Sequence, residues 1–64
     1  MLVSIKDTQE RDVLFNPWQV EAVYMFTPKD GGRRSTKIQL SKGSFIHTYD
    51  SVLSIQEAIN DADR

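Results

Sequence analysis

The residues best suited to binding chemistry lie in the segment Lys29–Arg34, which reads KDGGRR. Glycines expose backbone N–H groups, and adjacent arginines supply forked donors that match phosphate oxygens. The pattern lacks the spacing of a Walker-type phosphate loop, which ends in Lys-Ser/Thr before a helix. We therefore name Arg33 and Arg34 as candidate ligand-binding residues, with Lys37 extending the basic patch. The alternative is a solubilising hairpin tip.

Large aromatic side chains are the second group with binding potential. Aromatic residues and arginine dominate binding hot spots, and a flat ring beside a cation suits base stacking combined with phosphate pairing. Trp18 and Tyr24 are the candidate stacking residues, and Tyr24, Met25 and Phe26 are the candidate interface residues. Together with Val23 and Met25, five of the six large aromatics exceed what one short helix can cover. These five are Trp18, Tyr24, Phe26, Phe45 and Tyr49.

Catalysis has one candidate, His47, the single imidazole of the chain. Asp50 or Tyr49 could orient it as a general base. The chain has no cysteine and no serine in a nucleophile elbow. A histidine near a hairpin end is more often a surface residue, so we predict no enzymatic activity and no catalytic residue.

Metal binding is not predicted either. Asp7, Glu10 and Asp12 could gather as hard-cation ligands, but their spacing lacks the turn glycine and closing bidentate acid of a calcium loop. A solvated polar turn is the favoured interpretation. Without cysteine, and with one histidine, a structural zinc site is excluded as well, and no cofactor is expected.

Length and charge restrict the class of protein. A chain of 64 residues is a single domain, 1–64, near the lower limit for unaided folding. Eight basic and nine acidic residues leave a net charge of -1, which provides no global field for nucleic acid or membrane. No apolar run is long enough to span a bilayer, and the N-terminus lacks the pattern of a signal peptide. We expect a cytoplasmic protein that gains stability as a homo-oligomer.

The order of elements predicts an α+β fold, a small antiparallel β-meander of four to five strands with one C-terminal helix packed on one face. Alternation is clearest in Ser35–Ser41, where Thr36, Ile38 and Leu40 share one face. Helical spacing begins at Val52, with a cap from Asp50 and Ser51, and two acids in the last turn predict an end near Asn60. The predicted strands are Leu2–Lys6, Val13–Phe15, Trp18–Thr27, Ser35–Ser41 and Ser44–Tyr49.

The segment Trp18–Thr27 is predicted to be the central strand, apolar on both faces from Ala22 onward. Alternatively, Asn16 caps one helical turn with Pro17 at its first position, and the strand begins at about Glu21. Val23 and Met25 then face the core, while Tyr24 and Phe26 point away from it. Both alternatives leave one apolar face that needs a second subunit or a partner to cover it.

A family resemblance follows from the spacing of core and turn residues. The run Phe15-Asn16-Pro17, then Val20 and Val23, Thr36–Leu40, Gly43, Asp50-Ser51-Val52, Ile55 and Ile59 resembles the small flagellar-motility family FlbD and similar short phage and bacterial proteins. The resemblance covers about 13–60 and implies a small β-meander ending in a helix. The sequence departs from the family pattern at Trp18, at Asp50 and in its longer basic hairpin.

These features lead to a functional hypothesis with two alternatives. The protein is expected to be a non-enzymatic regulatory module that acts as a homo-oligomer and binds a protein partner or a small anionic ligand at a subunit boundary. The first alternative is a phage-type sponge for a host cyclic-nucleotide immune signal, with Arg33, Arg34 and Lys37 on phosphates and Trp18 or Tyr24 on a base. The second is a nucleic-acid-binding regulator.

Overall fold

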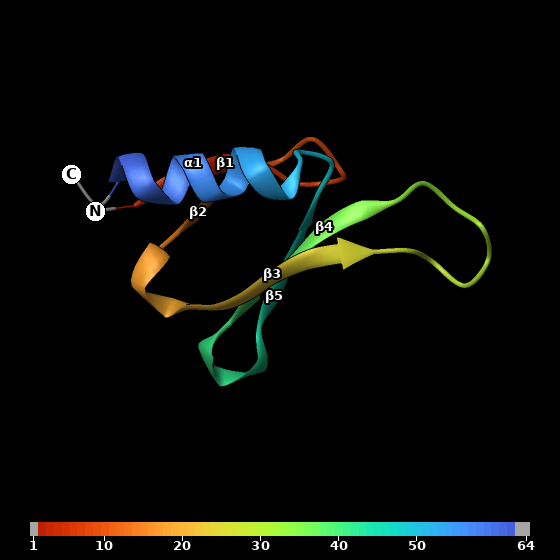
Figure 1. Cartoon of the computed structure of the whole chain (residues 1–64), viewed down its shortest axis with the longest axis horizontal. Helices are drawn as coiled ribbons and strands as arrows, with labels where there is room; N and C mark the ends of the chain where they lie inside the picture. The colour runs from red at the N-terminus through yellow and green to blue at the C-terminus, as the bar shows by residue number, and fades with distance from the viewer. Residues whose placement is uncertain (1, 63–64) are drawn as a thin grey trace.

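The computed structural model describes residues 2–62, which form two antiparallel sheets and one helix. The chain folds as an α+β protein, and the expected fold class is confirmed (Figure 1). The five strands are β1 (Val3–Lys6), β2 (Asp12–Phe15), β3 (Val20–Phe26), β4 (Ser35–Leu40) and β5 (Phe45–Thr48). The helix is α1 (Val52–Ala62), and two short 3-10 turns are η1 (Pro17–Gln19) and η2 (Ser41–Gly43).

The turn η1 divides the strands between the two sheets. Asn16 caps it, since its side-chain oxygen accepts a hydrogen bond from the Trp18 N–H at 3.0 Å, and Pro17 occupies the first position. The helical-turn alternative is thus confirmed, and a continuous strand from Trp18 is wrong. Because the chain turns here, β1 pairs with β2 alone, and β3 begins a separate sheet.

The position of β3 corrects the prediction of a central strand. The three-stranded sheet has the order β3-β4-β5, so β4 is central and β3 is an edge strand. Strand β3 lies beside β4 only, with Val23 opposite Ile38 and Tyr24 opposite Lys37. A central place would have required β2 to pair with β3, which η1 prevents.

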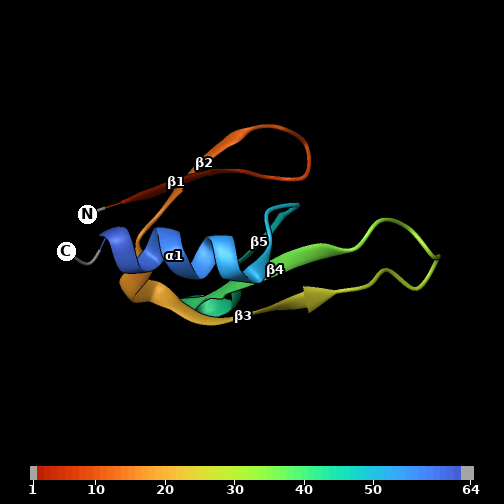
Figure 2. The same ribbon diagram turned by 45° about the horizontal axis from the view of Figure 1, so that its top comes forward.

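Helix α1 packs against both sheets. It contacts β1 and β3, and Figure 2 shows it between the β1–β2 hairpin and the three-stranded sheet. Ser51 caps its start, because the Ser51 hydroxyl accepts from the Ser54 N–H at 3.0 Å. The helix continues to Ala62, two residues beyond the predicted end at Asn60. Ile59 and Ala62 pack against the core, and this burial outweighs the acids of the last turn.

The core is small and lies where the helix meets the two sheets. Its buried members are Val3, Ile5, Phe15, Ile38 and Ile55. The predicted alternation of β4 is confirmed, because Thr36 and Ile38 are buried while Lys37 and Gln39 are half-exposed. We call the side of the three-stranded sheet that carries Ile38 the inner face, and the side that carries Lys37 the outer face.

Candidate functional site

The outer face gathers chemistry-bearing side chains from three strands. Strand pairing places Tyr24 of β3 opposite Lys37 of β4, and Lys37 opposite His47 of β5. Phe26 and Phe45 lie on the same face because they are two residues away from Tyr24 and His47 along their strands. We call the rings of Tyr24, Phe26 and Phe45, together with Lys37 and His47, the aromatic patch.

Lys37 occupies the middle of the aromatic patch. Its Nζ lies 4.4 Å from the centroid of the Phe45 ring, and 5.9 Å from the centroids of Tyr24 and Phe26. An ammonium over a ring face is attracted by the ring quadrupole, by about 0.5–1 kcal/mol at an exposed site. The exposed fractions of Tyr24, Phe26 and Phe45 are 40%, 37% and 54%, so the rings remain open to a ligand around a fixed positive charge.

His47 completes the patch as a packing residue. Its ring makes edge contacts with Phe26 and Phe45, at centroid distances of 5.0 Å and 5.3 Å. Its Nδ1 lies 3.3 Å from the Ser35 hydroxyl, which is buried. The carbonyl of Asp50, one of the two residues predicted to orient His47, accepts from the Thr36 hydroxyl at 2.6 Å. A buried serine and packed ring edges suit a structural role better than general-base catalysis.

The basic loop between β3 and β4 uses its polar groups internally. The Asp30 carboxylate accepts from the Gly32 N–H at 3.0 Å, and the Gly31 N–H donates to the Pro28 carbonyl at 3.2 Å. Gly31 takes a positive φ of 80°, which the turn requires. The sequence suggested that these glycine N–H groups bind a phosphate. In the structure they are already used in hydrogen bonds within the loop, so they cannot do so.

The two arginines of this loop lie beyond the patch. The Arg33 guanidinium carbon lies 3.8 Å from the centroid of the Tyr49 ring, in a cation–π contact, and Arg34 is exposed. The sequence missed Tyr49 as the partner of Arg33. Nor did the sequence connect Phe45 and His47 with Lys37. The tight Lys42-Gly43 turn could have predicted this arrangement, because it fixes Gln39 opposite Phe45 and hence Lys37 opposite His47.

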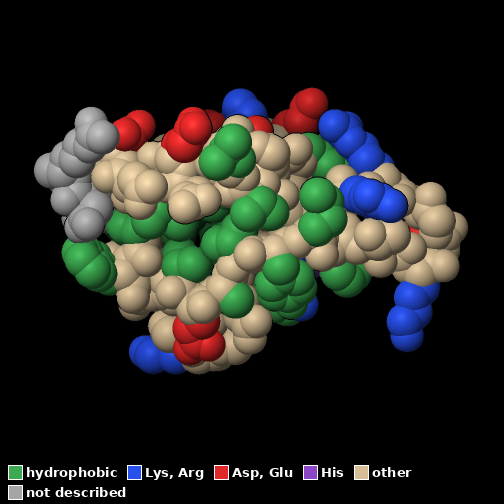
Figure 3. Space-filling view, viewed as in Figure 1, with side chains coloured by type: hydrophobic (Ala, Val, Ile, Leu, Met, Phe, Trp, Pro, Cys, Tyr) green, Lys and Arg blue, Asp and Glu red, His purple; other side chains and the backbone are tan. Residues whose placement is uncertain are grey.

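Trp18 lies in η1, at the start of β3 and apart from the aromatic patch. It is 76% exposed and borders a hollow of about 140 Å³ with Pro17, Ile59 and Asn60. A neighbouring hollow of about 260 Å³ is lined by residues that include Val23 and Ile59. Figure 3 shows this apolar depression between α1 and β3. Of the predicted ligand-binding residues, the structure brings together Tyr24 and Lys37.

The predicted interface residues are exposed. Met25 is 55% exposed on the inner face, where it pairs with Thr36, and it flanks the exposed rings of Tyr24 and Phe26 on the other face. Val23 packs against the core, as the helical-turn alternative predicted, whereas Met25 does not. Among the residues that the structure describes, both faces of the distal half of β3 are therefore covered only in part.

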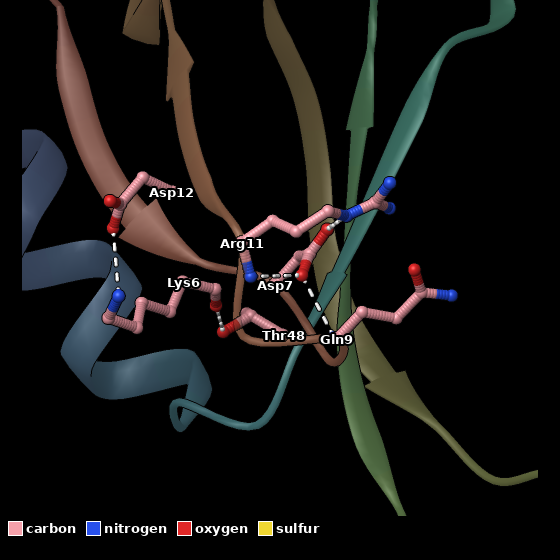
Figure 4. A network of polar contacts seen from close by, with 6 residues as sticks. All are labelled: Lys6, Asp7, Gln9, Arg11, Asp12 and Thr48. Carbon is pink, nitrogen blue, oxygen red and sulfur yellow. Dashed lines mark hydrogen bonds and ion pairs between the residues drawn. The ribbon is translucent and has the colours of Figure 1, made fainter.

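The acidic loop between β1 and β2 is a closed turn. The Asp7 carboxylate accepts from the N–H groups of Gln9 and Arg11 and from the Arg11 guanidinium, at 2.9–3.0 Å (Figure 4). The hydrogen bond from the Arg11 N–H, with those from Gln9 and the guanidinium, lowers the pKa of Asp7. Asp12 pairs instead with Lys6 at 3.0 Å. In residues 2–62 no group of three or more acidic or histidine side chains is placed to hold a metal ion.

Comparison with known proteins gives no guide to function. No family model, no characterised protein and no solved structure matches the sequence. The resemblance to FlbD and the cytoplasmic location therefore stay predictions. Within the described part of the chain, α1 is too short and too polar to cross a bilayer.

Proposed function

We propose that this protein is a non-enzymatic binding module whose outer sheet face binds a ligand with a planar ring and a phosphate, the chemistry of a nucleotide. The observation that carries the proposal is the position of Lys37, with its ammonium among the exposed rings of Tyr24, Phe26 and Phe45. A base that stacks on an exposed ring face of the patch not covered by Lys37 would place an attached phosphate near the Lys37 ammonium.

The energetics of the outer face favour this ligand class. Stacking of a base on an aromatic side chain contributes about 1–3 kcal/mol, and it tolerates any base because every base has a π-face. The face has no acidic residue at its paired positions, although the chain as a whole has a net charge of -1. Those positions are Ala22, Tyr24, Phe26, Ser35, Lys37, Gln39, Phe45 and His47.

A regulatory role by sequestration fits this site better than catalysis. The Ser35 hydroxyl that lies 3.3 Å from the His47 Nδ1 is buried, so this serine is poorly placed to attack a substrate. The same chemistry suits a free mononucleotide, a cyclic dinucleotide or the nucleotides of a single strand. Arg34 is exposed beyond the patch and would reach a phosphate only of a larger ligand.

Calorimetric titration with AMP, a cyclic dinucleotide and a single-stranded oligodeoxynucleotide tests the proposal. Lys37→Gln should weaken binding at least tenfold, because it removes the charge that faces the phosphate. Phe45→Ala should weaken binding five- to a hundredfold, because it removes an aromatic ring of the patch. Lys42→Gln is the matched control, since Lys42 is an exposed lysine in η2 that lies off the sheet face. It should bind as the parent does.

The three probes also distinguish between the possible classes of nucleotide ligand. Binding of the oligonucleotide that falls steeply with salt indicates a nucleic-acid ligand, whereas tight binding of the cyclic dinucleotide alone indicates a signal-sequestering role. The proposal fails if no probe binds at millimolar concentration, or if Lys37→Gln and Lys42→Gln bind equally well.

A further inference from the structure

The two edges of the three-stranded sheet differ in their backbone hydrogen bonding. On the β5 side, the Thr8 N–H donates to the His47 carbonyl at 2.9 Å, and the Thr48 hydroxyl donates to the Lys6 carbonyl at 2.7 Å. The loop after β1 therefore covers this edge at His47 and Thr48. On the β3 side, no turn, loop or cap hydrogen bond from residues 2–62 reaches 21–26. Strand β3 thus presents an open row of N–H and C=O groups that can pair with another strand.

The distal part of β3, residues 22–26, carries none of the features that usually prevent such pairing. Natural edge strands are protected by lysine, proline, short length or a bulge. Residues 22–26 read AVYMF and contain neither a charge nor a proline. A bulge between Val20 and Ala22 protects the start of the strand alone, and the rest pairs regularly with β4. The open edge and the exposed Tyr24, Met25 and Phe26 occupy the same half of the strand.

We infer that a second copy of this chain pairs antiparallel along β3, about a twofold axis at Met25. This register places the two Met25 side chains opposite each other on the inner face. On the outer face it places Tyr24 of each copy opposite Phe26 of the other, and aromatic cross-strand pairs are favourable. Beyond the end of β3 at Phe26, this register also brings Lys29 of the following turn near Glu21 of the other copy, so that two exposed opposite charges approach each other twice.

Neighbouring registers match less well. An axis at Val23 would place Met25 opposite Glu21, an apolar side chain against a charge. An axis at Tyr24 would place Glu21 opposite Thr27 and leave Lys29 without an acidic partner. The Met25 register is therefore the one in which apolar, aromatic and charged positions are all complementary.

Pairing in this register would join the two aromatic patches. The two sheets become one six-stranded sheet, because each copy contributes three strands. Tyr24 of one copy then extends the patch of the other across the boundary, beside its Phe26. This inference does not depend on the proposed ligand, since it follows from the β3 edge alone.

Cysteine cross-linking tests the register directly, because the chain has no native cysteine. Under mild oxidation, Met25→Cys should form a covalent dimer at least tenfold faster than Tyr24→Cys, whose nearest counterpart lies diagonally across the pair. Leu53→Cys is the control for exposure alone, since Leu53 is 63% exposed on α1. Equal rates for Met25→Cys and Leu53→Cys would overturn the inference.

A charge swap between Glu21 and Lys29 tests the same strand pairing without a covalent cross-link. By sedimentation equilibrium, Glu21→Lys and Lys29→Glu should each weaken dimerisation several-fold, and the double variant should restore it. Circular dichroism should show the same fold in all three, because both positions are exposed. A parent protein that stays monomeric at millimolar concentration, or a double variant that does not recover, contradicts the pairing.

Discussion

Thr48 and Lys6 join the two sheets of this protein through one short hydrogen bond, in which the Thr48 hydroxyl donates to the Lys6 carbonyl at 2.7 Å. The same hydroxyl accepts from the Asp50 N–H at 3.2 Å, and Thr48 is only 1% exposed. The bond spans 42 residues of sequence and holds the β1–β2 hairpin against the edge of β5. Figure 4 shows Thr48 pointing to Lys6 from β5.

Replacement of Thr48 by valine should destabilise the protein by about 1–3 kcal/mol, because two part-buried backbone groups lose their partner while the side-chain volume is kept. Urea denaturation followed by circular dichroism measures the change in the free energy of unfolding. Thr27→Val is the matched control, since Thr27 is exposed, and it should change stability little. Equal effects of the two substitutions would contradict a stabilising role for the Thr48 hydrogen bonds.

Acid should loosen the loop that Asp7 closes. The pKa of Asp7 is lowered, first of all by the hydrogen bond from the Arg11 N–H. A carboxyl with a lowered pKa contributes stability fully above its ordinary pKa of about 3.9, and loses it as pH falls through the lowered value. The free energy of unfolding should therefore fall on acidification below about pH 4. Asp7→Asn should reduce this part of the pH dependence, and an unchanged profile would contradict the assignment.

The core should respond strongly to truncation at Ile38, which is fully buried at the centre of β4. Ile38→Ala should cost about 2–5 kcal/mol, because it removes apolar contacts and leaves a cavity. In so small a domain this loss should unfold a large fraction of the protein at 37 °C. Leu53→Ala, on the exposed side of α1, should cost far less in a thermal melt.

Trp18 is the single tryptophan and is 76% exposed, so it reports on one end of the molecule. Its fluorescence should have the emission maximum of a solvated indole and should be quenched readily by acrylamide. A nucleotide that binds at the aromatic patch should leave this emission unchanged. A large shift on binding would instead place the ligand beside Trp18, as the sequence had suggested.

Local structure could be predicted from the sequence wherever one pattern determined it. The alternation of Ser35–Leu40 and the helical spacing from Val52 correspond to elements of the structure, and Asn16-Pro17 marked a helical turn. The pairing of strands could not be predicted, because it depends on where η1 directs the chain. An apolar segment such as β3 can be a central strand or an edge strand. Its composition does not distinguish the two, because it does not show which strands pair with it.

The candidate site was predicted only in part, for a similar reason. Arg33 and Lys37 read alike as basic residues, yet strand register places Lys37 among three rings and leaves Arg33 against Tyr49. The glycines of the loop suggested free N–H donors, but Asp30 and Pro28 take those hydrogen bonds. Such partners follow from the folded loop, which residue types alone do not specify.

The loop over β5 has a consequence for how the sheet can extend. A β-sheet with two open edges can add copies without limit and grow into a fibre. In this protein the hydrogen bonds from Thr8 to the His47 carbonyl and from Thr48 to the Lys6 carbonyl hold the loop after β1 over one end of β5. A strand that added to β5 would have to displace this loop, so the hairpin favours a pair joined through β3 over a growing fibre.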